Sequence, residues 1–231
     1  ATARPILLCH GMIACLSEVL FLEVPGSAGT LFHPRWALRQ TRRFGELDVC
    51  QQQALDALEA DYFHHRQESL WRACGQRTLQ AMRRASRMLL CGEDLGVVPA
   101  CVPPVLRRLG ILSLEIQRMP KSAATRFADP AAAPHLSVVS PSTHDMPTLR
   151  AWWREDPQRT ADFAWQGLGL DFPPLDLSGE LATRLLHQHL ESPAMWAVFL
   201  WQDLLAVDET LRHPDPAAER INDPAIMPYH W

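Results

Sequence analysis

The chain has 231 residues, of which 47% are hydrophobic and 21% are charged, so it can bury a core of ordinary size for a globular protein. Its net charge of −4 gives no reason to expect nucleic acid or an anionic membrane as a partner. The sequence holds no run of about 18 apolar residues, so it predicts no membrane-spanning helix.

Taken in chain order, the first strong pattern is helical and covers residues 46–87. Leu55, Leu58 and Tyr62 recur at the spacing of one helix face. Arg83 and Arg84 stand near the end of this stretch, where cations oppose the helix dipole. The sequence therefore predicts a helix-rich segment over these residues.

Three short apolar runs follow, over residues 88–91, 111–116 and 136–139. Continuous apolar runs of this length are typical of strands in a parallel sheet, which is buried on both faces. Helical patterns cover residues 103–109 and 148–155. The alternation of strands and helices predicts an α/β fold.

Polar clusters stand directly after these predicted strands. Glu93 follows the first strand and Asp145 follows the third. Because the active site of a (β/α) barrel is built at the carboxyl ends of its strands, we expect neighbouring strands to aim both carboxyl groups into one cleft. Residues 179–231 complete the chain with a helical stretch, predicted to continue from Leu185 to Leu200, and a proline-rich ending.

Two carboxyl groups on either side of a bond are what glycosidic bond cleavage needs. One is held protonated and donates to the leaving oxygen, while the other faces the oxocarbenium-like centre. Glu93 fits the proton donor because Gly92 allows close approach, and His144 beside Asp145 fits a ligand of sugar hydroxyl groups. An acidic residue after a strand can equally be a helix N-cap, so the spacing alone leaves both interpretations open.

Eight tryptophans add weight to a carbohydrate site, since the apolar faces of sugar rings stack on aromatic side chains. Trp152 and Trp153 are adjacent and cannot share one face of a helix. We therefore expect at least one of them to reach the rim of the cleft, and Trp152 is the substrate-binding candidate.

The histidines and cysteines do not predict a metal site. His64-His65 and His187-x-His189 lack the i, i+4 spacing that places two ligands on one helix face. The six cysteines contain no C-x-x-C pair and indicate buried, reduced thiols of a cytoplasmic protein, with a disulfide set or a zinc site as the alternative. No P-loop, G-x-S-x-G or G-x-G-x-x-G motif supports nucleotide binding or a serine nucleophile.

Longer motifs surround the candidate residues. Three of them are Cys91-Gly92-Glu93-Asp94-Leu95-Gly96, Glu115-Ile116-Gln117-Arg118-Met119-Pro120 and Pro141-Ser142-Thr143-His144-Asp145. Further motifs, which follow one another along the chain in the order of the family named below, include Phe32-His33-Pro34-Arg35, Leu149-Arg150-Ala151-Trp152-Trp153, Gln202-Asp203-Leu204-Leu205 and Glu219-Arg220-Ile221-Asn222-Asp223-Pro224. Together they resemble the 4-α-glucanotransferases called amylomaltases or disproportionating enzymes, glycoside hydrolase family 77, and within it the larger branch with N-terminal starch-binding modules. The resemblance runs from about residue 16 to the end.

The resemblance implies a fold and a reaction. The fold is α/β, the C-terminal portion of a (β/α)8 TIM barrel with helical insertions, and the reaction is a retaining transglycosylation by double displacement. By resemblance, Glu93 matches the acid/base, Asp145 the stabiliser of the transition state and His144 a ligand of a sugar hydroxyl at subsite −1. Weaker matches, which are architectural or line outer subsites, are Asp94, Gln202, Asn222 and Trp231.

The family's nucleophile lies in an Arg-x-Asp-His segment on an earlier strand, and these 231 residues contain no such segment. We therefore expect residues 1–231 to be a partial catalytic domain, the C-terminal half of the barrel without the nucleophile strand. Without a nucleophile the chain alone should be inactive. An open half-barrel also exposes a strand edge and half a core, so we expect the isolated chain to be unstable or to associate.

The resemblance further implies α-1,4-glucans and maltodextrins as partners, and transfer of a 1,4-α-D-glucan segment to the 4-hydroxyl of an acceptor glucan or glucose. It implies a cytoplasmic enzyme with no metal or organic cofactor and no nucleic acid or membrane partner. Two alternatives stay open: a catalytically inactive glucan-binding fragment, and an α-glucan hydrolase of the same clan. The ratio of transfer to hydrolysis separates the hydrolase from the transferase.

Overall fold

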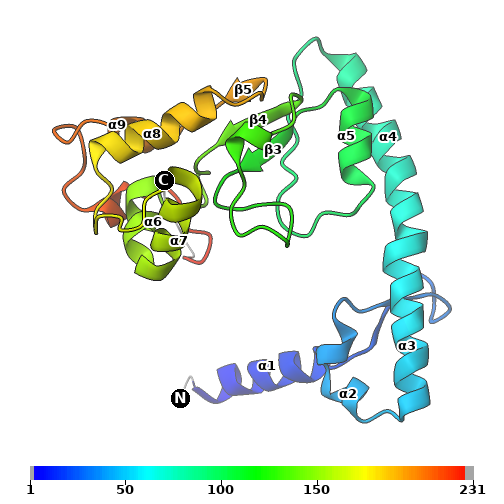
Figure 1. The fold of residues 1–231 in the computed structure, drawn as a ribbon. Helices are drawn as coiled ribbons and strands as arrows, with labels where there is room; N and C mark the ends of the chain where they lie inside the picture. Colours follow the sequence, from blue (N-terminus) through cyan, green and yellow to red (C-terminus); the bar gives the residue numbers. More distant parts are fainter. Residues whose placement is uncertain (1–2, 227–231) are drawn as a thin grey trace. The chain divides into compact units, whose positions relative to one another are not determined.

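A computed structural model describes residues 3–226, with side chains from Leu8 onward. The chain divides into two compact units, Ala1–Cys74 and Gly75–Trp231 (Figure 1). Among the described residues, no helix has both the length and the apolar character needed to cross a membrane.

The first unit is helical around one small antiparallel pair of strands, in which Phe21 pairs with Pro34. The α3 helix begins at a capping box, because the Asp48 carboxylate accepts from the Gln51 amide and the Gln51 side chain accepts from the Asp48 amide. The helix-rich prediction for residues 46–87 is confirmed. The elements are α1 (Ala3–Leu16), β1 (Phe21–Glu23), β2 (Phe32–Pro34), the 3₁₀ turn η1 (Leu38–Gln40), α2 (Arg42–Gly45), α3 (Val49–Asp61), the π-helical η2 (Tyr62–Arg66) and α4 (Gln67–Ala85), which contains the boundary between the units.

The second unit is built on a parallel sheet with the strand order β3-β4-β5. The predicted strands at 111–116 and 136–139 are confirmed, while the one at 88–91 is reduced to a parallel bridge between Cys91 and Leu112. The elements are α5 (Val102–Leu109), β3 (Ser113–Ile116), η3 (Pro130–Ala132), β4 (Ser137–Ser140), α6 (Leu149–Glu155), α7 (Pro157–Leu168), α8 (Gly179–Leu190), β5 (Trp196–Ala197), α9 (Trp201–Leu205) and η4 (Pro216–Glu219).

The predicted helical stretch through Leu200 is wrong after Leu190. The α8 helix ends at its C-cap Glu191, and Pro193 follows, whose ring and missing N–H do not allow a helix to continue. The chain then runs parallel to β4 as the short strand β5, with Trp196 opposite Val138.

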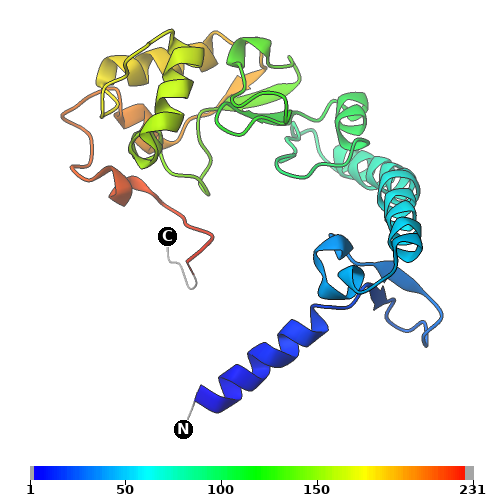
Figure 2. The same cartoon turned by 60° about the horizontal axis from the view of Figure 1, so that its bottom comes forward.

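Two hydrophobic clusters hold this unit together. The larger one joins α6, α7 and α8 through fully buried side chains such as Trp153, Phe163 and Leu185. The smaller one packs α5 against Ile111, just before β3. Both views show α6, α7 and α8 grouped on one side of the sheet and α5 on the other (Figure 2).

The α/β class is thus confirmed by a parallel sheet with helices around it. The sheet fits the predicted C-terminal portion of a (β/α)8 barrel, and residues 3–226 form no closed barrel.

The prediction of buried cysteines is wrong for Cys9, Cys15, Cys50 and Cys91, which are exposed. No disulfide links the six cysteines in the described part of the chain.

Candidate functional site

A cavity of about 580 Å³ lies over one face of the parallel sheet. Alternate residues of each strand line it, Leu114 and Ile116 from β3 and Val138 and Ser140 from β4, because side chains two apart share one face of a strand. The carboxyl end of the cavity is polar. Its amino end, at the level of Val138 and its partner Trp196, is apolar.

The polar end of this cavity contains two of the predicted site residues, Glu93 and His144. Glu93 follows the parallel bridge of Cys91, next to Gly92, whose amide donates to the Leu112 carbonyl at 2.8 Å. A Cβ at Gly92 would meet the Leu106 side chain at 3.5 Å, an ordinary contact, so this position does not demand glycine. The Glu93 side chain is exposed to solvent.

Asp145 lies directly beyond the cavity and is held from two sides. Its carboxylate accepts a hydrogen bond from the Asn222 side-chain amide, and the His144 Nε2 is 3.4 Å from the same oxygen. The Arg220 guanidinium donates to the Asp145 backbone carbonyl at 3.2 Å. The side chain of Asp145 stays 49% exposed, so its carboxylate is accessible to a ligand.

The strands that carry Glu93 and Asp145 are not neighbours. The segment at Cys91 pairs with the start of β3, and β4, which leads to Asp145, pairs with the other edge of β3. The expectation of neighbouring strands is therefore wrong, because the order of strands in a sheet is not visible in the local pattern. All three segments run parallel, so both residues still follow carboxyl ends at the same edge.

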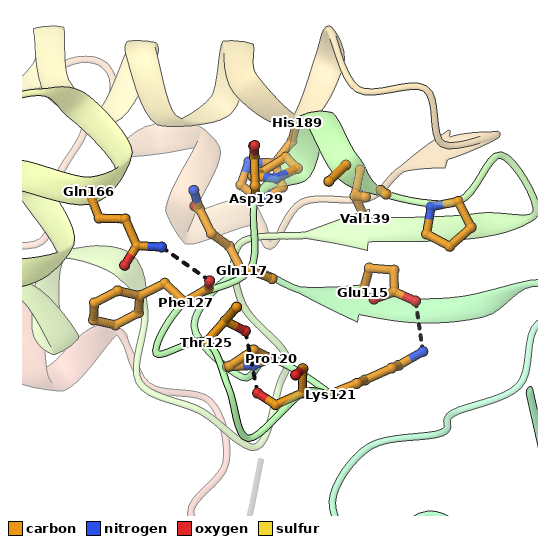
Figure 3. A pocket seen from close by; sticks show the side chains of 16 residues that line it. Glu115, Gln117, Pro120, Lys121, Thr125, Phe127, Asp129, Val139, Gln166 and His189 are labelled. Carbon is orange, nitrogen blue, oxygen red and sulfur yellow. Dashed lines mark hydrogen bonds and ion pairs between the residues drawn. The ribbon is translucent and has the colours of Figure 1, made fainter. Parts of the chain in front are cut away.

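Asp94 is buried and faces the sheet. Its Oδ1 accepts from the Leu114 backbone amide at 2.9 Å, and its Oδ2 is 2.8 Å from the Lys121 ammonium. Lys121 also contacts the Glu115 carboxylate at 2.8 Å (Figure 3). These contacts attach the loop after Glu93 to β3.

Trp152 and Trp153 are 5% and 1% exposed and belong to the core. The expectation that one of them reaches the rim is not met, because both pack against Phe163. The Arg118 and Arg159 guanidinium groups lie over the Trp152 ring, 5.0 and 4.3 Å from its centroid.

Two buried charged residues near the site, Arg118 and Asp203, belong to the quoted motifs but were not among the expected site residues. Arg118 is 8% exposed and donates to the carbonyls of Pro141 and Pro147, each at 2.8 Å. Burial lowers the pKa of Arg118 to about 10. Asp203 is fully buried, accepts from the Leu149 amide at 2.8 Å, and has its pKa raised by burial.

The opposite face of the sheet has a second cavity of about 350 Å³ under the loop after β3. Glu115 and Gln117 from β3 and its following loop, Val139 from β4 and His189 from α8 line it (Figure 3). Phe127 and several prolines and alanines make most of its wall apolar. None of the candidate catalytic carboxylates lines this second cavity.

The remaining candidates lie at the C-terminal side of the site. Gln202 lies in α9, and Trp231 lies outside the described residues. Within residues 3–226, no cluster of three or more His, Cys, Asp or Glu side chains has a geometry that would hold a metal ion.

Comparison with known proteins gives consistent matches. A family model described as 4-alpha-glucanotransferase matches residues 31–231. The 4-alpha-glucanotransferase DPE2 of Oryza sativa subsp. japonica is 39% identical over 96% of this chain and 24% of its own length. The 4-alpha-glucanotransferase of Chlamydia caviae is 38% identical over 66% of this chain and 29% of its own length.

Among solved structures, the amylomaltase from Streptococcus agalactiae in complex with acarbose is similar at 18% identity. The similarity covers 59% of this chain and 25% of that chain, with a TM-score of 0.45. The chain thus spans only about a quarter of the length of the relatives that it matches.

Proposed function

Because the chain belongs to the 4-α-glucanotransferase family, we propose that it supplies part of the active site of an enzyme that transfers 1,4-α-D-glucan segments. The acceptor is the 4-hydroxyl of another glucan or of glucose. The observation that supports this proposal is that Glu93 and His144 line one end of the same cavity, with Asp145 directly beyond it.

In this proposal Glu93 donates a proton to the glycosidic oxygen as the reducing-end part of the donor glucan leaves, and later removes one from the acceptor hydroxyl that attacks the glycosyl-enzyme. Its exposed side chain at the mouth of the cavity allows both steps. Asp145 places a negative charge beside the oxocarbenium-like centre, where it stabilises the transition state.

The neighbours of Asp145 have supporting roles. The Asn222 amide occupies one carboxylate oxygen and so fixes the orientation of the carboxyl group. His144, which both lines the cavity and lies beside Asp145, is placed to donate a hydrogen bond to a sugar hydroxyl. Asp94 attaches the loop of Glu93 to β3, through its contacts with Leu114 and Lys121.

Double displacement also needs a carboxylate nucleophile. No Arg-x-Asp-His segment occurs in the 231 residues, and the chain spans about a quarter of its relatives, so we assign the nucleophile to another part of the protein. The partners that we propose are α-1,4-glucans and maltodextrins, including starch- or glycogen-derived ones. We also propose a cytoplasmic location and a reaction without metal or organic cofactor.

The test is to incubate the full-length protein with maltotriose and to separate the products. A transferase gives both shorter and longer maltodextrins, whereas a hydrolase gives only shorter products. Binding of maltodextrin with no products at all would favour the inactive glucan-binding alternative and contradict the proposed transfer.

A further inference from the structure

We infer that residues 117–121, the segment directly after β3, hold both candidate catalytic loops in place, through Arg118 on one side and Lys121 on the other. The inference rests on the proposed function, since it concerns the loops of Asp145 and Glu93. It assigns positioning roles to Arg118 and Lys121, neither of which lines the cavity of about 580 Å³.

Arg118 closes the loop that carries His144 and Asp145. Its Nε donates to the Pro141 carbonyl at 2.8 Å, before the loop, and its Nη2 donates to the Pro147 carbonyl at 2.8 Å, after it. The same Nη2 donates to the Ser142 hydroxyl. One planar guanidinium thus joins the two ends of the segment in which His144 and Asp145 lie.

The guanidinium is well suited to this contact. It is 8% exposed and is covered by the Trp152 ring, 5.0 Å away. A buried charge is tolerated only when hydrogen bonds compensate the lost water, so the loop carbonyls and Arg118 stabilise one another. A lysine has a single nitrogen and cannot reproduce two divergent contacts from a rigid fork.

Lys121 holds the loop that carries Glu93. Its ammonium lies 2.8 Å from the Asp94 Oδ2, and Asp94 is the residue directly after Glu93. The same ammonium lies 2.8 Å from the Glu115 carboxylate on β3 (Figure 3). Since the other Asp94 oxygen accepts from the Leu114 amide, Asp94 is fixed to β3 at two points.

The strand order gives this segment its role. β3 lies between the strand segment that leads to Glu93 and the strand that leads to Asp145. A segment that leaves the carboxyl end of β3 can therefore reach the loop on either side. Glu93 and Asp145 are thereby held relative to one another although their strands are not neighbours, so that the proton donor and the transition-state stabiliser can act on the same glycosidic bond.

The first experiment measures hydrogen exchange in the full-length protein, because this readout does not depend on activity. In Arg118→Ala, amides of residues 142–148 should exchange roughly tenfold faster or more, while those of residues 93–96 change little. Lys121→Ala should give the opposite pattern. Equal exchange in all variants, or a general acceleration across the chain in both, would overturn the inference.

The second experiment measures transfer from maltotriose. A displaced catalytic group slows the chemical step, so we expect Arg118→Ala to lower kcat about 10- to 100-fold with KM changed less than about threefold. Added guanidinium ion should partly restore kcat, and Arg118→Lys should not restore it. Arg126→Ala, which removes an exposed cation of the same loop paired with Asp162, is the matched control and should keep the wild-type kcat.

The outcomes separate the two proposals. Wild-type protein without transfer would contradict the proposed function, and the exchange pattern would still decide whether the two cations hold the two loops. An active wild type with unchanged kcat in Arg118→Ala and Lys121→Ala would overturn this inference alone. If Arg118→Ala does not fold, the Lys121→Ala exchange pattern and kcat decide.

Discussion

The side-chain amide of Asn222 donates a hydrogen bond to the carboxylate of Asp145, across a sequence separation of 77 residues. Asn222 follows η4, near the end of the described chain, and Asp145 follows β4. The C-terminal segment therefore takes part in the candidate site directly, and Arg220 adds a second contact to the Asp145 backbone.

Substitution of Asn222 tests this contact. We expect Asn222→Ala in the full-length protein to lower kcat for glucan transfer about tenfold, because the Asp145 carboxylate loses the donor that orients it. Steady-state kinetics with maltotriose measures the effect, and an unchanged melting temperature shows that the fold is intact. A wild-type kcat in the variant would show that Asn222 has no part in orienting Asp145.

The buried His189 predicts how stability depends on pH. Burial lowers its pKa from the ordinary value of 6.5, against the opposing effect of backbone hydrogen bonds to Leu185 and Ser140. Below pH 6.5 the imidazole therefore binds a proton more readily in the unfolded chain than in the folded chain. His189 thus makes the free energy of unfolding fall as the pH falls.

His189→Gln removes this titration. Urea unfolding of the 231-residue chain, at concentrations low enough to keep it monomeric, is measured at about pH 7 and about pH 5. The loss of unfolding free energy should be smaller in the variant than in the wild type. Other titrating groups cancel in this comparison. Equal losses in both proteins would contradict the effect assigned to His189.

The open sheet face predicts association of the isolated chain. Trp196 and Val198 are 55% and 52% exposed at the cavity, and Leu89 is 47% exposed. Exposed apolar side chains next to a strand edge favour self-association. Sedimentation velocity should therefore detect oligomers of the 231-residue chain, and Trp196→Gln should reduce them. A monomer at all accessible concentrations would contradict this prediction.

We expect no glucan transfer by the 231-residue chain alone. The covalent intermediate needs a nucleophile, and the sequence has no Arg-x-Asp-His segment to supply it. Incubation with maltotriose should leave the substrate unchanged, while the full-length protein under the same conditions gives products. A product ladder from the isolated chain would mean that a carboxylate within it acts as the nucleophile.

Local pattern was enough for some elements of the second unit. Apolar runs predicted β3 and β4, and helical spacing predicted α5 and α6. It failed at β5, because Met195, Trp196, Phe199 and Leu200 share a helical spacing by chance while Pro193 prevents a helix. It also failed on strand order, which depends on contacts between distant segments.

In the candidate site too, some residues could be predicted from local pattern and others could not. The positions of Glu93 and Asp145 after strands were visible in the sequence, since both follow apolar runs. The roles of Arg118 and Lys121 were not visible, because they depend on partners far along the chain. Arg118 binds carbonyls 23 and 29 residues away, and Lys121 joins the nearby Glu115 to Asp94, which is 27 residues away. The expectation that Trp152 or Trp153 reaches the rim was wrong because two adjacent residues on one helix can both be buried when other helices pack around it. Here α7 covers both tryptophans.

The central claim is that Glu93 acts as the acid/base, and replacing this residue tests it most directly. Glu93→Gln in the full-length protein should lower the rate of transfer from maltotriose by about a thousandfold or more. The reason is that no side chain then donates a proton to the leaving oxygen or accepts one from the acceptor hydroxyl. Glu180→Gln, an exposed carboxyl in the first turn of α8, is the matched control and should keep full activity.

The decisive comparison uses α-maltosyl fluoride, whose leaving group needs no proton. We expect Glu93→Gln to form the glycosyl-enzyme from this donor in a single turnover at a rate close to that of the wild type, although it does not cleave maltotriose. Equal loss with both donors, or full activity of Glu93→Gln on maltotriose, would contradict the assignment.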